Sequence, residues 1–336
     1  MGKDIETKDV IIVGAGPAGL SAAIFTVLDG WSTLILESDW LGGQGAIAYT
    51  VANYPGFPPG DGTLLMANME QQVFSSPLSR SKADLKYEKA MDLDPSELIV
   101  STTNNRYQGQ AIILATGSAM QRLGIPGETR FIGKGVSYYA VRDAKRFAEK
   151  KVLAVGGGNA AAKNALVAKS TASEVTLVHR KHSLRAHPAM VRRLHKEGVK
   201  IQYDTEVKEI KGRNQVASAV LANNTSGAEE EIPVDWVVIC VGTVPNTGLA
   251  RRAGLEMTGE FVKVDDQMRT SAKGVFACGE VTPGPRHLIS STAEGSTAGM
   301  SASEHVALEM VKLGETFEGV RNGKHAEEYL ATLRAD

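Results

Sequence analysis

The sequence predicts an α/β protein made of two similar units, because one pattern occurs twice in its 336 residues. In each copy a short apolar strand leads into a glycine-rich turn, an alanine-rich helix follows, and a second strand comes after the helix. A strand, a Gly-x-Gly-x-x-Gly or Gly-x-Gly-x-x-Ala turn and a helix in this order are typical of dinucleotide-binding folds. We therefore expect two Rossmann-like, three-layer ββα domains.

The first copy contains a strand at Asp9–Val13, the turn Gly14-Ala15-Gly16-Pro17-Ala18-Gly19, a helix to about Leu28, and a strand at Thr33–Leu36 that ends in Glu37. Gly14 makes the turn, Gly16 lets the backbone approach a pyrophosphate, and Gly19 lets helix and strand pack closely. The helix N-terminus then faces the phosphates. Glu37 is placed to accept hydrogen bonds from ribose hydroxyls. The alternative, a glycine-rich turn without a ligand, is disfavoured by this complete context.

The second copy contains a strand at Val152–Val155, the turn Gly156-Gly157-Gly158-Asn159-Ala160-Ala161, a helix to about Lys169 and a strand at Val175–Val178. No acid ends this second strand; His179, Arg180 and Lys181 follow instead, with Arg185 further on. A carboxylate there would repel a 2′-phosphate, whereas a basic cluster attracts one. A solvated charged loop is the alternative. The contrast between Glu37 and Arg180 predicts FAD in the first copy and NADPH in the second.

Each copy is followed by short strands, which indicates an internal duplication with the second copy inserted into the first. Residues 84–117 suggest a β-meander that ends in a strand at Ala111–Ala115. After the second copy we expect strands at Val199–Tyr203, Val216–Leu221, Asp235–Val241 and Gly274–Val281. The expected domains are 1–120 with 244–336 for FAD, and 121–243 for NAD(P)H.

Composition excludes several functions. The formal net charge of −1 does not favour nucleic acid or an anionic membrane as a partner. No apolar run reaches the roughly 18–20 residues of a membrane span. The polar, charged stretch Met1–Lys8 is unlike a signal peptide, so a cytoplasmic location is expected. No metal site is predicted. The two cysteines, Cys240 and Cys278, each lie in an apolar stretch, form no Cys-x-x-Cys pair, and are interpreted as inert small hydrophobes.

Taken together, these residues resemble the low-molecular-weight thioredoxin reductase family of flavoproteins across nearly the whole chain. The resemblance rests on an ordered set of motifs: VIIVGAGPAGLSAA, Gly42-Gly43-Gln44, Asn53-Tyr54-Pro55-Gly56, ILATGS, GKGVS, VGGGNAA, VHRKHSLRA, VGTVPNT and GVFACGEV. Several of these motifs are individually common among flavoproteins, but the ordered set is highly specific.

The resemblance implies two groups of cofactor-binding residues. The FAD group consists of Gly14, Gly16, Ala18, Gly19, Glu37, Gly43, Gln44, Asn53, Thr116, Gly117, Gly279, Glu280, His287 and Leu288. The NADPH group, with NADH as an alternative nucleotide, consists of Gly156, Gly158, Asn159, Ala160, Ala161, His179, Arg180, Lys181 and Arg185. Glu280 stands where the family has an Asp that contacts the ribityl chain and pyrophosphate region, and its added methylene is expected to keep this contact with a shift or through water. His287 follows Arg286 where the family usually has Arg-Gln, so the local hydrogen bonding at the flavin is expected to differ.

The chain departs from the family where the redox-active cysteines are expected. The family has Cys-Ala-Thr-Cys-Asp after Gly-Val-Ser, and this chain has Tyr139-Ala140-Val141-Arg142-Asp143. Disulfide exchange needs a thiolate to attack and a second sulfur to resolve the mixed disulfide. A phenol and a guanidinium cannot substitute, so disulfide reduction is not expected. Tyr139, Arg142 and Asp143 become the candidate catalytic residues.

Three hypotheses remain for the reaction. The leading one is electron transfer from NADPH through FAD to ferredoxin or flavodoxin, as in ferredoxin–NADP reductases on this scaffold that lack the cysteines. The second is an NAD(P)H oxidase or diaphorase that reduces oxygen, a quinone or a small molecule, with Arg142 stabilising an anionic reduced flavin. The alternative to this role is that Tyr139 and Arg142 only fill the space that the cysteines occupy in the family. The third is a redox-inactive flavin or nucleotide sensor.

Two further expectations concern assembly. The resemblance implies a homodimer. Near the C-terminus, one apolar helical face is indicated by the spacing of Ala326, Tyr329, Leu330 and Leu333. Such a helix would cover the flavin, and the alternatives are a helix that packs on its own domain or a frayed tail.

Overall fold

The structure, a computed structural model, describes residues 5–48, 50–79 and 81–312, which divide into two compact units. The first unit comprises the described residues up to Ser118 together with those from Pro245 onward, and the second comprises Ala119–Val244. The chain crosses between the units twice, and the short strands β7 (Ser118–Met120) and β16 (Thr243–Pro245) pair at these crossings.

The first unit is built on a sheet of seven strands in the order β3-β2-β1-β6-β5-β4, with β19 also paired with β6. The strands are β1 (Ile5–Val13), β2 (Thr33–Glu37), β3 (Ala83–Tyr87), β4 (Ala90–Asp94), β5 (Ile99–Thr102), β6 (Arg106–Leu114) and β19 (Val275–Ala277). Strands β4, β5 and β6 pair antiparallel, whereas β1, β2, β3, β6 and β19 pair parallel. The expected meander is therefore confined to β4–β6. Strand β3 instead extends the parallel sheet by pairing with β2. The alternating pattern of its residues does not distinguish a parallel partner from an antiparallel one.

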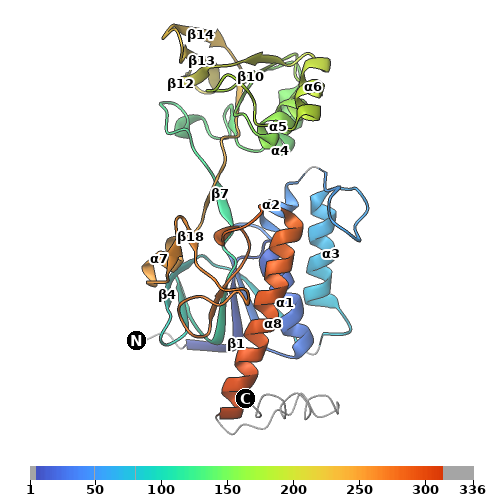
Figure 1. Cartoon of the computed structure of the whole chain (residues 1–336), viewed down its shortest axis with the longest axis vertical. Helices are drawn as coiled ribbons and strands as arrows, with labels where there is room; N and C mark the ends of the chain where they lie inside the picture. The colour runs from blue at the N-terminus through green and yellow to red at the C-terminus, as the bar shows by residue number, and fades with distance from the viewer. Residues whose placement is uncertain (1–4, 49, 80, 313–336) are drawn as a thin grey trace. The chain divides into compact units, whose positions relative to one another are not determined.

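Helices cover one face of this sheet, and shorter elements cover the other (Figure 1). The elements are α1 (Pro17–Asp29), α2 (Gly43–Ala46), α3 (Gly62–Ser75), α7 (Gly248–Arg252), the hairpin β17 (Met257–Thr258) and β18 (Phe261–Val262), the 3-10 turn η3 (Gly279–Val281) and α8 (Leu288–Lys312). Because side chains alternate along a strand, Val10 and Ile12 of β1 pack with α1, α3 and α8, whereas Ile11 and Val13 pack with Leu249 of α7. This gives the first unit three layers.

The second unit repeats the scheme with a fully parallel sheet in the order β11-β10-β9-β15-β8 and a separate antiparallel sheet β12-β13-β14. Its strands are β8 (Val136–Ser137), β9 (Lys151–Val155), β10 (Glu174–Val178), β11 (Lys200–Gln202), β12 (Thr205–Gly212), β13 (Val216–Asn223), β14 (Glu229–Pro233) and β15 (Trp236–Ile239). Its helical elements are η1 (Thr129–Phe131), α4 (Ala140–Asp143), η2 (Ala144–Phe147), α5 (Asn159–Lys169) and α6 (Pro188–Lys196). Helices α5 and α6 cover one face of the parallel sheet, and the antiparallel sheet covers the other.

Two local expectations differ from the structure. The segment expected as one strand at Gly274–Val281 is strand β19 only to Ala277 and then turns into η3, because Gly279 has a φ of +78° that breaks an extended chain. The sequence predicts no strand at the positions of β12 and β14. The apolar face of Ala326, Tyr329, Leu330 and Leu333 lies outside the described residues. Within residues 5–48, 50–79 and 81–312, no helix is both long and apolar enough to cross a membrane.

Candidate functional site

Four segments of the first unit meet at the carboxyl edge of its parallel sheet. Val13, the last residue of β1, pairs with Leu36 and with Leu114, and Leu114 also pairs with Ala277. The residues that follow these strands therefore lie side by side, as they do in doubly wound sheets that bind ligands at this edge. This register brings the glycine-rich turn, Glu37, the segment 115–118 and the segment 278–280 together.

The glycine-rich turn packs too closely for side chains at two of its positions. A Cβ at Gly14 would lie 2.2 Å from the carbonyl oxygen of Ala115, and a Cβ at Gly19 would lie 1.9 Å from the carbonyl oxygen of Gly14. Gly16 differs, because no atom lies within 4 Å of the position its Cβ would take. Open space therefore remains beside Gly16, where α1 begins and its free N–H groups point outward.

Glu37 closes the turn from the end of β2. Its carboxylate accepts hydrogen bonds from the backbone N–H groups of Ala15 and Asp39, each at 2.8 Å. A carboxylate has about four lone-pair sites. Two acceptor positions are therefore left for hydroxyl groups.

A second cluster of side chains lies where α2, β7 and η3 meet. Gln44 Nε2 donates to the carbonyl oxygen of Ser118 at 2.6 Å and to Ser118 Oγ at 2.9 Å, and lies 3.4 Å from Glu280 Oε2. The Ser118 hydroxyl also donates to Glu280 Oε2. The backbone N–H of Gly42 donates to the carbonyl oxygen of Ala15, so this cluster is attached to the glycine-rich turn. The extra methylene of Glu280 lets its carboxylate reach across to Ser118.

The turn that carries Glu280 is held by a carboxylate of α8. Glu294 Oε2 accepts from the Gly279 N–H at 2.8 Å and from Thr282 Oγ1 at 2.7 Å. Burial raises the pKa of Glu294, which these two hydrogen bonds partly oppose. Gly279 also packs against Ala18, since a Cβ there would lie 2.8 Å from the Ala18 Cβ.

The remaining predicted flavin residues lie in varied surroundings. Thr116 Oγ1 donates to the carbonyl oxygen of Asn246, and the Asn246 amide donates to the Thr116 carbonyl oxygen. Asn53 and His287 are exposed, and Leu288 begins α8. Gly43 lies beside the turn, because its Cβ would lie 3.2 Å from the Gly16 Cα. The structure therefore does not join Asn53 and His287 to the hydrogen-bonded cluster.

These residues fit a dinucleotide such as FAD. The open space beside Gly16 and the N-terminus of α1 suit a diphosphate. The free acceptor positions of Glu37 suit ribose hydroxyls. Polar groups around Gln44 offer both donors and acceptors further along the same edge of the sheet.

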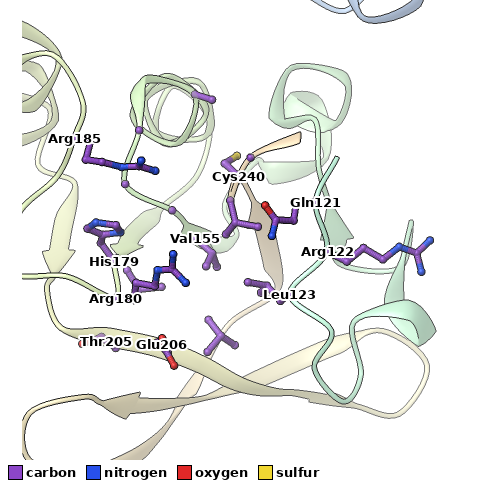
Figure 2. Close-up of a pocket in the computed structure, with 18 of the residues that line it drawn as sticks. Gln121, Arg122, Leu123, Val155, His179, Arg180, Arg185, Thr205, Glu206 and Cys240 are labelled. Atoms are coloured by element: carbon purple, nitrogen blue, oxygen red, sulfur yellow. The ribbon is translucent and has the colours of Figure 1, made fainter. Parts of the chain in front are cut away.

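The second unit contains a cavity of about 490 Å³ at the carboxyl edge of its parallel sheet (Figure 2). The glycine-rich turn Gly156–Ala160 forms one wall. His179, Arg180 and Arg185 line one side of the cavity, while Gln121 and Leu123 lie on the opposite side. Strand β12 contributes Thr205–Lys208. Of the predicted NADPH residues, Ala161 and Lys181 do not line the cavity, although Ala161 is buried behind the turn and Lys181 is exposed.

His179 packs directly against the second glycine-rich turn. A Cβ at Gly157 would lie 2.2 Å from the His179 ring, so only glycine leaves room for the imidazole. The side chain is 6% exposed, and its Nε2 has no hydrogen-bond partner among the described residues. Burial lowers the pKa of His179, and the nearby cations Arg185, Arg180 and Lys181 lower it further. The imidazole is therefore neutral at neutral pH.

The basic segment after β10 is fixed to the turn by backbone hydrogen bonds. The N–H groups of Arg185 and Ala186 donate to the Gly157 carbonyl oxygen at 2.7 and 3.0 Å. The N–H of His187 donates to Asn159 Oδ1 at 2.7 Å. These bonds hold the backbone of Arg185 beside the cavity that its side chain lines.

Arg142 and Asp143 belong to the short helix α4 and Tyr139 directly precedes it, but the three side chains have different environments. The Arg142 guanidinium lies 5.5 Å from the centroid of the Tyr139 ring, and the Arg142 side chain is 56% exposed. Asp143 is buried and accepts from Ser137 Oγ at 2.6 Å and from Arg146 Nη1 at 3.2 Å. In this conformation the Asp143 carboxylate is bonded inside the second unit.

These contacts give Asp143 a testable structural role. Asp143→Ala is expected to lower the free energy of unfolding by about 1–3 kcal/mol, because the Ser137 hydroxyl and the Arg146 guanidinium lose their acceptor. Asp143→Asn keeps one oxygen acceptor and should cost less. Urea unfolding followed by circular dichroism measures both. Arg142→Ala removes only the 4.0 Å ion pair between a largely exposed guanidinium and the same carboxylate, so it should stay within about 0.5 kcal/mol. A stable Asp143→Asn variant with abolished flavin reduction would instead assign Asp143 a catalytic role.

The two cysteine thiols are poor nucleophiles. Burial raises the pKa of Cys240 to about 12, with a hydrogen bond to Asn164 acting in the opposite direction. Burial, and then the charge of Glu294, raise the pKa of Cys278 as well. Both thiols are free, and they lie in different units. At neutral pH neither supplies the thiolate that disulfide exchange requires.

Each unit contains one glycine-rich turn of the dinucleotide-binding type, which is the arrangement that an oxidoreductase joining two nucleotide cofactors requires. Comparison with known proteins agrees: residues 8–295 match the model of the pyridine nucleotide-disulphide oxidoreductase family, and the chain belongs to this family. It is an FAD-dependent, thioredoxin reductase-like oxidoreductase, and the family implies FAD and NADPH as its cofactors. The resemblance drawn from the sequence is confirmed.

Three relatives illustrate the similarity. A thioredoxin reductase from Treponema pallidum is 36% identical over 303 residues, which cover 89% of this chain and 97% of that protein. A ferredoxin–NADP reductase from Ignicoccus hospitalis is 33% identical over 310 residues, which cover 89% and 98%. The crystal structure of Lactococcus lactis thioredoxin reductase matches with a TM-score of 0.82 at 30% identity, over 90% of this chain and 99% of that one. The α/β fold class with Rossmann-like sheets is thereby confirmed.

Several residues of these candidate sites are not predicted by the sequence. Ser118 and Glu294 hold the first site together, and Gln121, Leu123 and the β12 residues line the cavity of the second. Ser118 had a signal in the sequence, because it follows Gly117 directly after a buried strand. The cavity residues had none, since they come from loops and from a strand of alternating charged residues.

Proposed function

We propose that this protein transfers electrons from NADPH through FAD to an acceptor other than a disulfide, with ferredoxin or flavodoxin as the first candidates. The observation that carries the proposal is that the chain lacks a reactive pair of thiols. Positions 139 and 142 hold Tyr and Arg, and the only two cysteines have raised pKa values and lie in different units. Disulfide exchange needs two sulfurs acting at one place.

The proposed cofactor contacts follow from the two sites. In the first unit the turn Gly14–Gly19 and the N-terminus of α1 bind the diphosphate, Glu37 binds a ribose, and Gln44 lines the flavin. In the second unit the turn Gly156–Ala161 binds the diphosphate, and Arg180, Lys181 and Arg185 supply positive charge for the 2′-phosphate. When bound, FAD supplies a group that takes up a hydride and returns electrons singly or in pairs.

One relative supports a protein acceptor. The Ignicoccus hospitalis relative is a ferredoxin–NADP reductase of similar length, so this scaffold carries that activity elsewhere. Its likeness is close to that of the thioredoxin reductases, which means that overall identity does not separate the two activities. The lack of a reactive pair of thiols is therefore what supports an acceptor other than a disulfide. A homodimer, as the resemblance implies, belongs to the same proposal.

A second candidate, an NAD(P)H oxidase or diaphorase, is favoured by the surroundings of Arg142. Its guanidinium is exposed and lies near the ring of Tyr139, at the position where the family has a cysteine. An exposed cation beside an aromatic ring suits a small anionic or aromatic acceptor such as a quinone. A redox-inactive sensor is the third candidate.

The proposal predicts a clear order of acceptors. The FAD-loaded protein should lose its visible flavin absorption on anaerobic addition of NADPH. Reoxidation should then be at least tenfold faster with ferredoxin or flavodoxin than with thioredoxin disulfide at equal concentration. Stopped-flow absorbance at the flavin band measures both steps.

Each alternative gives a different result in the same experiment. Rapid reoxidation by oxygen, with release of peroxide, would favour the oxidase. Absence of bleaching by both NADPH and NADH would favour the sensor. Fast reoxidation by thioredoxin disulfide would refute the proposal, because it requires thiol chemistry that these residues do not supply.

A further inference from the structure

The side of the second unit's cavity that lies opposite the basic residues is a segment without regular secondary structure. Residues 121–125 belong to no helix or strand, and four of them line the cavity (Figure 2). Such a segment has no hydrogen-bond ladder, so its backbone N–H groups need other acceptors. At one end the Gln121 N–H donates to the carbonyl oxygen of Gly242 at 2.9 Å. Further along, the N–H groups of Leu123 and Gly124 turn away from the cavity to a side chain.

That side chain is a buried carboxylate. Glu128 is 1% exposed, and its Oε1 and Oε2 accept from the backbone N–H groups of Leu123 at 3.0 Å and of Gly124 at 2.7 Å. Burial of a charged group is unfavourable unless the group is hydrogen-bonded. These two bonds therefore offset the burial of Glu128 and hold the segment at the same time. The chain can return to the carboxylate because Gly124 and Gly127 have φ values of +74° and +84°, which favour glycine.

The phenol of Tyr138 is a third donor to the same carboxylate. Its hydroxyl donates to Glu128 Oε1 at 2.6 Å. Burial, followed by the hydrogen bond and the charge of Glu128, raises the pKa of Tyr138, so the phenol keeps its proton and remains a donor. The two carboxylate oxygens thus serve different groups. Oε1 accepts from Tyr138 and Leu123, and Oε2 accepts from Gly124.

The turn that carries Glu128 is also attached to a strand that lines the cavity. The Ile210 N–H of β12 donates to the carbonyl oxygen of Pro126 at 3.0 Å. A Cβ at Gly127 would lie 1.9 Å from the Ile210 carbonyl oxygen, so the turn packs directly on this strand. Strand β12 contributes Thr205–Lys208 to the cavity. The turn at 124–128 therefore contacts two of the elements that shape the cavity.

We propose that Glu128 is a positioning residue for nucleotide binding, which holds the N–H groups of Leu123 and Gly124 and so keeps the side of the cavity opposite Arg180 in its binding conformation. The inference rests on the proposed function in one respect, which is that NADPH occupies this cavity. Because this side lies opposite the residues assigned to the 2′-phosphate, it serves the parts that NADPH and NADH share. Glu128 thus sets the affinity for both nucleotides, whereas Arg180 sets the preference between them.

Glu128→Gln tests the proposal, because it keeps the length of the side chain and removes one of its two acceptors. An amide NH₂ at the Oε2 position faces the Gly124 N–H, and at the Oε1 position it faces the Leu123 N–H, so one backbone donor loses its acceptor in either orientation. The Kd values of NADP⁺ and NAD⁺ should each rise about three- to tenfold, the effect of one hydrogen bond, and their ratio should stay within about twofold of the wild-type ratio. Calorimetric titration of the FAD-loaded protein, without an electron acceptor, measures both constants.

Tyr138→Phe is the matched control. It removes one donor and leaves the Glu128 carboxylate with both backbone N–H groups, so both Kd values should stay within about twofold of wild type. The binding stoichiometry separates positioning from folding. If Glu128 only stabilised the fold, Glu128→Gln would lower the fraction of protein that binds and leave the Kd of the remainder unchanged. Unchanged Kd values in Glu128→Gln would overturn the proposal, as would equal losses of affinity in Tyr138→Phe and Glu128→Gln.

An Arg180→Ala background shows whether the two sides of the cavity act separately. In that background Glu128→Gln should raise the Kd of NADP⁺ by the same factor as in the wild type, because sites without shared partners are additive. A loss of NADP⁺ affinity alone, with NAD⁺ unchanged, would overturn the proposal by assigning Glu128 to the 2′-phosphate.

Glu128→Asp covers the case in which Glu128→Gln does not fold. It keeps both acceptors and shortens the side chain by one C–C bond, about 1.5 Å, so it should raise both Kd values by one common factor. Unchanged constants in folded Glu128→Asp would then overturn the proposal. A wild-type protein that binds neither NADP⁺ nor NAD⁺ overturns the nucleotide assignment of the proposed function together with this inference. Normal wild-type binding with unchanged Kd values in the variants overturns this inference alone.

Discussion

Replacing Gly19 by alanine is expected to prevent α1 from packing on the glycine-rich turn and to yield protein without bound FAD. The added Cβ would lie 1.9 Å from the Gly14 carbonyl oxygen and 3.0 Å from the Gly14 carbonyl carbon. These are backbone atoms, which cannot rotate away as a side chain can. Overpacking of this kind costs about 1–3 kcal/mol, and more where the backbone must move. Urea unfolding and the ratio of flavin to protein absorbance after purification measure the two losses.

Gly16→Ala is the matched control three residues away. The Gly16 backbone has φ −77° and ψ −174°, an extended conformation that any residue adopts, and no atom lies within 4 Å of the new Cβ. The free energy of unfolding without FAD should therefore change by less than about 1 kcal/mol, the size of a helix N-cap effect. FAD affinity should still fall at least tenfold, because the methyl group occupies the space proposed for the diphosphate. Normal FAD binding by Gly16→Ala would place the diphosphate elsewhere, and a normally stable Gly19→Ala would contradict the packing.

The parts of the fold that sequence alone predicts are those set by local patterns. Gly14–Gly19 and Gly156–Ala161 are short motifs whose strand, turn and helix are adjacent in the chain, so their physical reason is visible in a few residues. Strand β3 shows the opposite case. Its residues alternate like those of a meander, but its parallel pairing with β2 depends on a partner 50 residues away in register, Thr33 with Ala83. Pairing of this kind is decided by the sheet and not by the segment.

The candidate site shows the same division. Gln44 and Glu280 were identified separately by resemblance, yet they are 236 residues apart, and Ser118 joins them across 74 and 162 residues. No pattern in the sequence predicts that a serine hydroxyl links the two. Gly157 is a similar case, since the requirement for glycine at this position comes from the His179 ring that packs against it in the fold. The chemistry that a single residue can perform is predicted from the local sequence, whereas its hydrogen-bond partners are known only once the fold is known.

The second large effect is expected at Arg180. Arg180→Ala should raise the KM for NADPH about 10–100-fold and leave the KM for NADH nearly unchanged. The Arg180 guanidinium lies at the cavity and makes no ion pair with any other described residue, so its charge is free for a ligand (Figure 2). Hydrogen bonds to charged groups contribute about 1.5–3 kcal/mol, and each 1.4 kcal/mol is a factor of ten. The measurement is the initial rate of anaerobic flavin reduction with each nucleotide.

Lys196→Ala provides the control for this prediction. Lys196 is an exposed cation of α6 that does not line the cavity. The substitution changes the net charge of the protein by the same amount, so it reports the long-range electrostatic effect alone. That effect should be less than about twofold at physiological salt, where the screening length is about 8 Å. Equal losses for NADPH and NADH in Arg180→Ala would show that Arg180 contacts a part shared by both nucleotides. The 2′-phosphate would then have to be recognised by Lys181 and Arg185, and the preference for NADPH over NADH would not depend on Arg180.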